Sequence, residues 1–268
     1  MSEVRIAACS EPGARSHNED DLRHGHAAAG HYAVLADGAG GHKRGAEAAR
    51  RSVLRIESEL RDHAPPFEPE SLTRIVRRAH AELQRGQAAL PPEARMHCTV
   101  VVLWVDPAAG HALWTHVGDS RLYRVRHGRT DIVTADDSVV HRMLQAGLIT
   151  PEQSRHHPQK NQLLAALGID GEVDPHTVAR PVEVLEGDAF LLCTDGWWDG
   201  FDAAAIAASL SSALTPQAWL QDMQAQIVRN ARPRQDNYSA IAVWVGDPAE
   251  VACPDDEDTI PRARPASP

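Results

Sequence analysis

Six short apolar segments, rich in β-branched and aromatic residues, constrain the fold of this chain more than any other feature. Each is five to eight residues long, which is typical of a strand buried in a sheet. Turn sequences at residues 106–110 and 127–128 join neighbouring segments closely enough to predict antiparallel hairpins. The expected strands cover residues 32–36, 99–105, 112–117, 121–126, 189–193 and 238–245.

Amphipathic helices are expected between these blocks of strands. Apolar residues such as Ala49, Val53, Ile56 and Leu60 recur at spacings of three and four, which is the period of one helix face. Because helices and strands come in blocks and do not alternate one for one, the pattern favours an α+β fold over a doubly wound parallel sheet. The helices are predicted at residues 43–62, 68–88 and near 215–230.

The composition is that of a globular protein with a sizeable core, since 43% of the 268 residues are hydrophobic and 24% are charged. A formal net charge of -10 argues against binding to nucleic acid or to an anionic membrane surface. No apolar run is long enough to predict a transmembrane helix, and the first residues lack a secretory pattern. The four cysteines are far apart without a CxxC pair, so neither a zinc knuckle nor a disulfide framework is predicted, and a reducing cytoplasm is expected.

One folded domain is expected, at residues 1–246, followed by a tail at residues 247–268. The tail contains five prolines, an acidic cluster at residues 255–258 and almost no apolar periodicity. Such a composition is typical of a disordered segment. No linker or internal repeat divides the rest of the chain.

Four aspartates fall where the expected core strands begin or end. An ionised carboxylate close to a core is costly unless it is paired or bound to a cation. Strand ends that converge at one sheet edge could gather these carboxylates around a hard cation such as Mg²⁺ or Mn²⁺. Asp37, Asp119 and Asp195 each follow an apolar run, and Asp236 precedes the last strand.

Each of these aspartates also has a simpler interpretation. Asp37 and Asp195 both precede a glycine, and Asp-Gly is a common turn dipeptide. Asp119 could instead pair with Arg121. The repetition of the pattern at four strand ends is what favours a metal site.

A polar loop near the amino terminus adds an arginine and further acids. Arg15 is followed by Asn18, Glu19 and Asp20. The planar fork of an arginine matches the oxygens of a phosphate, and the acids could hold metal-bound waters. A solvated loop is the alternative interpretation of this segment taken alone.

Together these segments resemble the metal-dependent protein phosphatases, the PPM or type-2C serine/threonine phosphatase family, in its bacterial stand-alone form. The resemblance spans roughly residues 4–246, and the motifs occur in the order of the family. Residues 134–168 are similar to the family's flap region. The matching motifs are Arg15-x-x-Asn18-Glu19-Asp20, Val34-Leu-Ala-Asp37-Gly38-Ala-Gly-Gly41, Cys98-Thr99, His116-Val-Gly-Asp119-Ser-Arg121, Leu191-Leu-Cys-Thr-Asp195-Gly196 and Asp236-Asn237.

The resemblance implies a four-layer α-β-β-α sandwich, in which two antiparallel sheets pack face to face between helix pairs. The active site is expected at one edge of the sandwich. By similarity, Asp37 bridges two divalent ions and the backbone carbonyl of Gly38 binds one of them. Asp195 and Asp236 complete the shell of the other ion.

The remaining roles also follow from the resemblance. Glu19 and Asp20 are expected to act mainly through metal-bound water. Asp119 is expected to form a third, weaker metal site together with Asp195. Arg15 is expected to bind the substrate phosphate.

The implied activity is hydrolysis of phosphoserine and phosphothreonine by water activated between two Mn²⁺ or Mg²⁺ ions. The implied partners are phosphoprotein substrates and a cognate serine/threonine kinase. The family also implies a monomer.

Two positions depart from the family's pattern. Many members have a histidine directly after Asp-Gly as the proposed proton donor, whereas this chain has Ala39. His42 or a metal-bound water would then have to donate the proton to the leaving oxygen. The pair His97-Cys98 stands where Gly-Thr is usual, and an effect on packing is expected there.

Two alternative functions remain open at this point. One is a non-catalytic relative that keeps the fold and binds a phosphoprotein, and the other is a hydrolase of small phosphoesters. A decayed enzyme is expected to lose at least one metal carboxylate. Because Asp37, Asp119, Asp195 and Asp236 are all present, catalysis is favoured.

Overall fold

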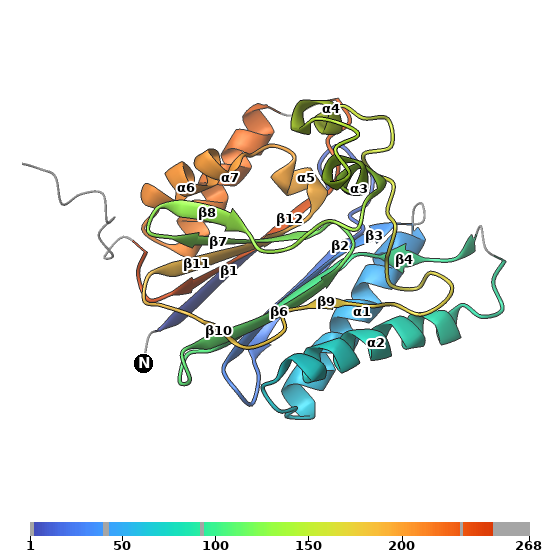
Figure 1. Ribbon diagram of the computed structural model, residues 1–268, viewed down its shortest axis with the longest axis horizontal. Helices are drawn as coiled ribbons and strands as arrows, with labels where there is room; N and C mark the ends of the chain where they lie inside the picture. Colours follow the sequence, from blue (N-terminus) through green and yellow to red (C-terminus); the bar gives the residue numbers. More distant parts are fainter. Residues whose placement is uncertain (1–2, 40–42, 92–93, 231–232, 249–268) are drawn as a thin grey trace, which may run out of the picture.

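Two antiparallel sheets lie face to face in the computed structural model, which describes residues 3–39, 43–91, 94–230 and 233–248 (Figure 1). The first sheet joins the amino-terminal strand to the carboxy-terminal one at full length. In spatial order, its strands are β1 (Val4–Glu11), β12 (Tyr238–Val245), β11 (Asp188–Cys193), β7 (Arg121–Arg126) and β8 (Arg129–Ile132).

The second sheet is built around the hairpin that the residue 106–110 turn predicts. Its main strands, again in spatial order, are β10 (Val182–Glu183), β6 (His111–Val117), β5 (Val100–Asp106), β3 (His31–Ala39) and β2 (Asp20–His26). Two short strands extend this sheet, β4 (His97–Cys98) against β3 and β9 (His176–Thr177) against β6.

Helix pairs cover the outer faces of both sheets. The second sheet packs against α1 (Lys43–Asp62) and α2 (Pro69–Gly86), and the first against α6 (Ala203–Ser211) and α7 (Pro216–Arg229) (Figure 1). This arrangement confirms the expected four-layer sandwich. Three short helices gather at one end of it, namely α3 (Val139–Gln145), α4 (Pro151–Arg155) and α5 (Asp195–Trp198).

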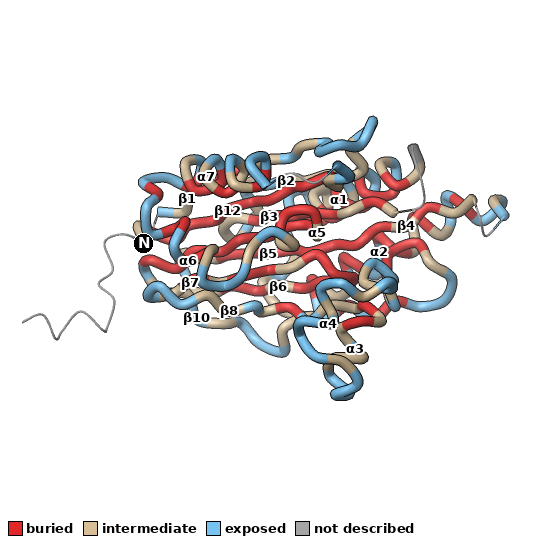
Figure 2. Tube along the Cα trace, turned by 90° about the horizontal axis from the view of Figure 1, so that it is seen from above, coloured by how far each residue is buried: buried red, intermediate tan, exposed pale blue. Residues whose placement is uncertain are grey.

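The central strands β5, β11 and β12 are apolar on both faces because each sheet is covered on both sides. In β5, Val101 and Leu103 pack between the two sheets, whereas Val102 and Trp104 pack under α1 and α2. Phe190 of β11 lies in the layer between the sheets. In Figure 2 the central strands are buried, and the helices that cover them are exposed on their outward faces. Continuous apolar runs are what such doubly covered strands require.

The predicted helices at residues 43–62, 68–88 and 215–230 are confirmed within two residues at each end. Six strands were not predicted, namely β1, β2, β4, β8, β9 and β10. The sequence of β2, Asp-Asp-Leu-Arg-His-Gly-His, is polar and only half-buried, but backbone pairing with β3 holds it over its full length. Backbone hydrogen bonding to a neighbouring strand does not depend on side-chain polarity, so the sequence of β2 has no apolar pattern that would predict a strand.

The structure bears on some of the predictions about membrane spans, cysteines and domain boundaries. Within the described ranges, no helix combines the length and the hydrophobicity needed to cross a bilayer. Cys9, Cys98 and Cys193 are free thiols. The predicted tail lies outside the described residues apart from residues 247 and 248, so the domain boundary stays a prediction.

Replacing Phe190 by alanine tests the layer between the sheets. Phe190 is 1% exposed, so Phe190→Ala should lower the free energy of unfolding by about 3–5 kcal/mol. Ile132→Ala is the matched control in the same sheet, because Ile132 is 50% exposed and its loss should cost under about 0.5 kcal/mol. Equal denaturation midpoints for the two variants would contradict this packing.

Candidate metal centre

Five aspartates from five different chain segments converge at one end of the sandwich. Asp37 lies near the end of β3, and Asp20 is its direct partner at the start of β2. Asp119 lies between β6 and β7, Asp195 begins α5 just after β11, and Asp236 precedes β12. The negative charges of the other four all act on Asp37. The structure therefore brings together the four aspartates predicted from strand ends, with Asp20 from the amino-terminal loop.

Asp20 links the two sheets directly. Its Oδ2 accepts hydrogen bonds from Ser239 Oγ at 2.6 Å and Thr194 Oγ1 at 3.1 Å. Both donors belong to the first sheet or its edge, whereas Asp20 pairs with Asp37 in the second sheet. These bonds hold the carboxylates of the two sheets at one common edge.

Burial and mutual repulsion raise the pKa values of four of these carboxyl groups, those of Asp20, Asp37, Asp119 and Asp195. Loss of water raises the pKa of Asp20 to about 7, with a smaller contribution from the charge of Asp195. The same causes raise the pKa of Asp119 to about 8, and burial followed by repulsion from Asp236 raises that of Asp195 to about 6. Burial, and then the charge of Asp20, raises the pKa of Asp37 well above its usual range. Ionising all of them together is costly unless a cation enters the cluster.

The donor set fits hard divalent cations. The second oxygen of Asp20, Oδ1, is buried and has no hydrogen-bond partner among the described residues. Buried carboxylate oxygens with unused lone pairs are ligands that Mg²⁺ and Mn²⁺ prefer. The residues that could hold such ions are Asp37, Asp195, Asp236, Asp119, Asp20, Glu19 and the carbonyl of Gly38.

Gly38 is required by a close approach of backbone segments. A Cβ atom at Gly38 would collide with the carbonyl of Gly45 in α1 and lie 2.6 Å from the carbonyl oxygen of Glu19. The Gly38 amide also donates to the Glu19 carbonyl at 3.2 Å. The absence of a side chain thus lets β3, α1 and the Glu19 segment meet beside Asp37.

Arg15 lies at the rim of the cluster. Its Nη2 donates to Asp236 Oδ2 at 2.8 Å, and its side chain is 57% exposed. The loop that carries it is fixed by the Ala14 amide, which donates to the carbonyl of Gln235 at 2.9 Å. A guanidinium that contacts both solvent and the carboxylates can meet a phosphate group arriving from outside.

Asn237 holds the amino-terminal loop, a role that the sequence did not reveal. Its Oδ1 accepts from the Glu19 amide, and its Nδ2 donates to the carbonyls of Pro12 and His17, each at 2.9 Å. The side chain is 7% exposed, so these three bonds replace water. The sequence signalled Asn237 only as part of the Asp236-Asn237 motif, which does not indicate its partners.

The backbone of Asp119 is held by Trp198, and its side chain forms no salt bridge with Arg121. Arg121 instead makes a bidentate contact with Asp136, at 2.7 and 2.9 Å. Its guanidinium carbon lies 3.5 Å from the centre of the Trp198 ring, and Trp198 Nε1 donates to the Asp119 carbonyl at 3.0 Å. The alternative pairing expected from the sequence is therefore not what the structure shows.

The two departures from the family's pattern lie beside the cluster. Cys98 is buried and contacts Ser52, with Sγ and Oγ 3.2 Å apart, which agrees with a role in packing. Ala39 ends β3 and has no ionisable group. His42, one of the two proton donors considered, lies outside the described residues.

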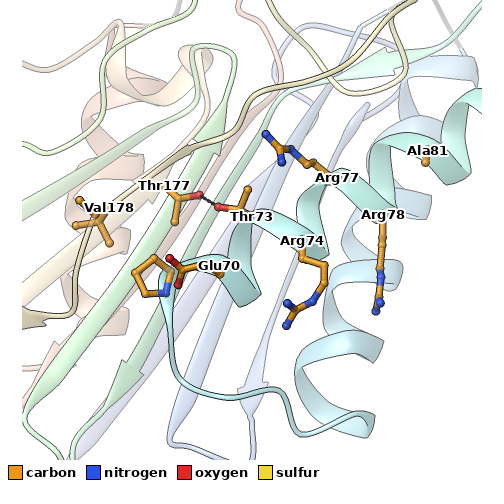
Figure 3. A pocket seen from close by; sticks show the side chains of 10 residues that line it. Glu70, Thr73, Arg74, Arg77, Arg78, Ala81, Thr177 and Val178 are labelled. Atoms are coloured by element: carbon orange, nitrogen blue, oxygen red, sulfur yellow. Dashed lines mark hydrogen bonds between the residues drawn. The ribbon is translucent and has the colours of Figure 1, made fainter.

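A hollow of about 700 Å³ lies elsewhere, between α2 and the segment that follows β9 (Figure 3). Its wall includes Glu70, Arg74 and Arg77, and Thr73 Oγ1 contacts Thr177 Oγ1 across it at 2.8 Å. None of the converging aspartates lines it. This hollow is therefore separate from the carboxylate cluster, which lies at the edge of the sheets.

A two-sheet sandwich with a carboxylate cluster at its edge defines a class of metal-binding α+β proteins. The sequence model described as Protein phosphatase 2C matches residues 13–235, and the chain belongs to this family. It is 32% identical over 213 residues to the serine/threonine protein phosphatase PstP of Mycobacterium tuberculosis, covering 77% of this chain and 39% of that protein. The match with the protein phosphatase PhpP of Streptococcus pneumoniae is 30% identical and covers 68% and 74%.

A solved structure shows the same fold with metal. The catalytic domain of PstP in complex with two manganese ions superposes with a TM-score of 0.78 and 27% identity, covering 91% of this chain and 99% of that one. The two-sheet fold and the family are thereby confirmed. The individual ligands of this chain stay predictions.

Manganese should stabilise the protein more at about pH 8 than at about pH 5.5. At the lower pH, Asp20, Asp119 and Asp195 hold protons because their pKa values are raised to about 7, 8 and 6, and the metal must displace them. At the higher pH, Asp20 and Asp195 are ionised and Asp119 is partly so, and their repulsion destabilises the chelated protein. Thermal unfolding with Mn²⁺ and with excess chelator measures both effects.

The variant Asp37→Asn tests the role of the carboxylates in the same thermal-unfolding experiment. Removing one charge from the cluster should raise the melting temperature of the chelated protein at about pH 8 and remove most of the response to Mn²⁺. Asp131→Asn, in the distant strand β8, should behave as the wild type. A stabilisation by Mn²⁺ that is independent of pH would contradict the role of these carboxylates.

Replacing Asn237 by alanine tests the support of the loop. Three backbone groups would lose their hydrogen bonds to the buried side chain, so Asn237→Ala should lower the free energy of unfolding by about 1–3 kcal/mol and weaken Mn²⁺ binding. The control is Asn230→Ala at the exposed end of α7. Urea denaturation and Mn²⁺ titration of both variants measure these effects. Wild-type stability and Mn²⁺ affinity in Asn237→Ala would contradict the role of Asn237 in holding the loop.

Proposed function

We propose that the protein is a phosphatase that hydrolyses phosphoserine and phosphothreonine in proteins with Mn²⁺ or Mg²⁺. The observation that carries the proposal is the cluster of partly buried carboxylates whose Asp20 Oδ1 has no partner among the described residues, with the exposed Arg15 at its rim. A cluster of this kind needs cations, and an arginine beside it suits a phosphate ester.

The metal shell would follow the family's pattern. Asp37 would bridge two ions, the carbonyl of Gly38 would bind one, and Asp195 and Asp236 would bind the other. When bound, such ions supply Lewis-acid chemistry that makes water nucleophilic near neutral pH. The chain's own contribution is to fix these oxygens on strand ends, so that little reorganisation is needed when the phosphate enters.

Three further acids complete the proposed site. Glu19 and Asp20 would act mainly through metal-bound water, and Asp20 would do so through the Oδ1 that the sheets leave free. Asp119, whose backbone carbonyl is held by Trp198, would form a third metal site with Asp195.

Arg15 would bind and orient the phosphate. Its present partner is Asp236 at 2.8 Å, a residue that a bound cation would neutralise in its place. The guanidinium is then available for two oxygens of the phosphate, which its planar fork matches. Ala39 provides no proton for the leaving serine or threonine oxygen, so this position does not act as the general acid.

The proposed partners are phosphoproteins and a cognate serine/threonine kinase, with a monomer acting in the cytoplasm. The relatives named above are serine/threonine or protein phosphatases, which supports this class of substrate. The chain spans only 39% of the length of PstP, and its activity is therefore proposed for the part that the two share.

Release of phosphate from a phosphothreonine peptide tests the proposal. Hydrolysis should require Mn²⁺ or Mg²⁺, stop with excess chelator, and fall by several orders of magnitude in kcat for Asp37→Ala or Asp195→Ala. Arg15→Ala should mainly raise KM, because it removes a contact to the phosphate. Asp131→Ala, far from the site, is the control.

Two outcomes would contradict the proposal. Wild-type hydrolysis by Asp37→Ala or Asp195→Ala would show that these carboxylates do not hold the reacting groups. No release of phosphate with any metal, together with binding of the phosphopeptide, would identify a non-catalytic binding module. Hydrolysis of small phosphoesters but of no phosphopeptide would point to the small-molecule alternative.

A further inference from the structure

A second group of metal-ligating side chains lies outside the carboxylate cluster. His116 of β6 and His176 of β9 are direct partners across the two strands. Asp137 reaches them from the segment before α3, where its amide donates to the Gly118 carbonyl at 3.0 Å. One nitrogen or oxygen atom from each of the three lies within 4.8 Å of those from the other two. Three separate chain segments thus present ligand atoms to one place.

The contacts of His116 leave one of its nitrogens unused. Nε2 lies 2.8 Å from the carbonyl oxygen of Ala135. Because a carbonyl only accepts, Nε2 carries the proton and Nδ1 carries the free lone pair. Nδ1 is buried and has no hydrogen-bond partner in the described part of the chain, and the residue is 3% exposed. A buried acceptor without a partner costs free energy that a bound ion would recover.

His176 and Asp137 complete a mixed donor set. His176 Nε2 lies 2.7 Å from Asp137 Oδ1, and its ring stacks on that of His116 with 5.0 Å between centroids. The other oxygen of Asp137, Oδ2, accepts from the Gly118 amide at 3.0 Å. His176 is exposed, which gives an ion a path from solvent.

From this geometry we infer that His116, Asp137 and His176 bind one transition-metal ion of the Zn²⁺ class. Two imidazoles and one carboxylate are ligands that Zn²⁺ accepts, with water in the fourth position. The Ala135 carbonyl on His116 and the Gly118 amide on Asp137 are the outer contacts that orient such ligands. Burial lowers the pKa of His116, which keeps its ring in the neutral form that binds metal.

The donor chemistry separates this site from the carboxylate cluster. The cluster offers only oxygen and suits Mg²⁺ or Mn²⁺, whereas imidazole nitrogen favours Zn²⁺ or Co²⁺. An ion at the histidine site would join β6, β9 and the segment before α3. Asp137 also holds Gly118, the residue before Asp119, so the two sites are neighbours along the chain.

Titration with Co²⁺ in excess Mg²⁺ tests this site without any measurement of activity. Mg²⁺ occupies the oxygen ligands and is colourless, so strong visible absorption reports Co²⁺ bound by imidazole with few ligands. We expect one equivalent of Co²⁺ that Zn²⁺ displaces. In His176→Ala and in Asp137→Asn, the affinity should fall roughly tenfold or more. His111→Ala, at the other end of β6, is the matched control and should keep the absorption.

Further measurements separate the histidine site from the carboxylate site. Asp37→Asn should lose Mn²⁺ binding and keep the Co²⁺ absorption, so failure of the phosphatase proposal would leave this result intact. Addition of Zn²⁺ should shift the ring-nitrogen NMR signals of His116 and His176 together, which avoids a substitution of the buried His116. Co²⁺ binding that is unchanged in His176→Ala, or that is lost in Asp37→Asn alone, would overturn the inference.

Discussion

Repulsion among crowded, partly buried carboxylates is the constraint on which the rest of this structure depends. Asp37 is directly opposite Asp20 in the β2–β3 register, and the charges of Asp195, Asp119 and Asp236 also act on it. No sheet would gather these groups for stability alone, because burying unpaired charges opposes folding. The core between the sheets and under the helices must supply the free energy that holds them together. Stability and cation binding are therefore linked, since whatever binds the folded cluster also stabilises the fold.

The sandwich architecture explains why the cluster can be precise. Each aspartate comes from a different segment, so its position depends on how the two sheets pack and not on one local motif. Asp20 is bonded to Ser239 and Thr194 at the edge of the opposite sheet, and Asn237 ties the amino-terminal loop to the start of β12. Residues with no ligand role thus fix the distances between ligands. A site built on rigid strands needs less reorganisation than one built on loops.

Much of the fold was predictable because doubly covered strands and amphipathic helices leave clear apolar patterns. Helix α1 begins and ends where the pattern predicted, and the aspartates at strand ends were visible as interruptions of apolar runs. Strand β2 was not visible, since its pairing depends on backbone bonds and its side chains are polar. The partners of Asn237 and the His116–His176 pair could not be predicted either. Both depend on which strands are neighbours and in which register, and that is decided by the packing of the whole sandwich.

Two kinds of metal chemistry meet in the segment between β6 and β7. The Gly118 amide donates a hydrogen bond to Asp137 Oδ2. The next residue, Asp119, is repelled by the charge of Asp195 in the carboxylate cluster. An ion held by Asp137 would restrict Gly118 and, through one peptide unit, the direction of Asp119. Coupling between two binding sites is reciprocal. If Zn²⁺ at the histidine site alters the affinity of the Asp119 site for Mn²⁺, then Mn²⁺ must alter the affinity for Zn²⁺ by the same factor. The short path through Gly118 is the physical element that would carry that coupling.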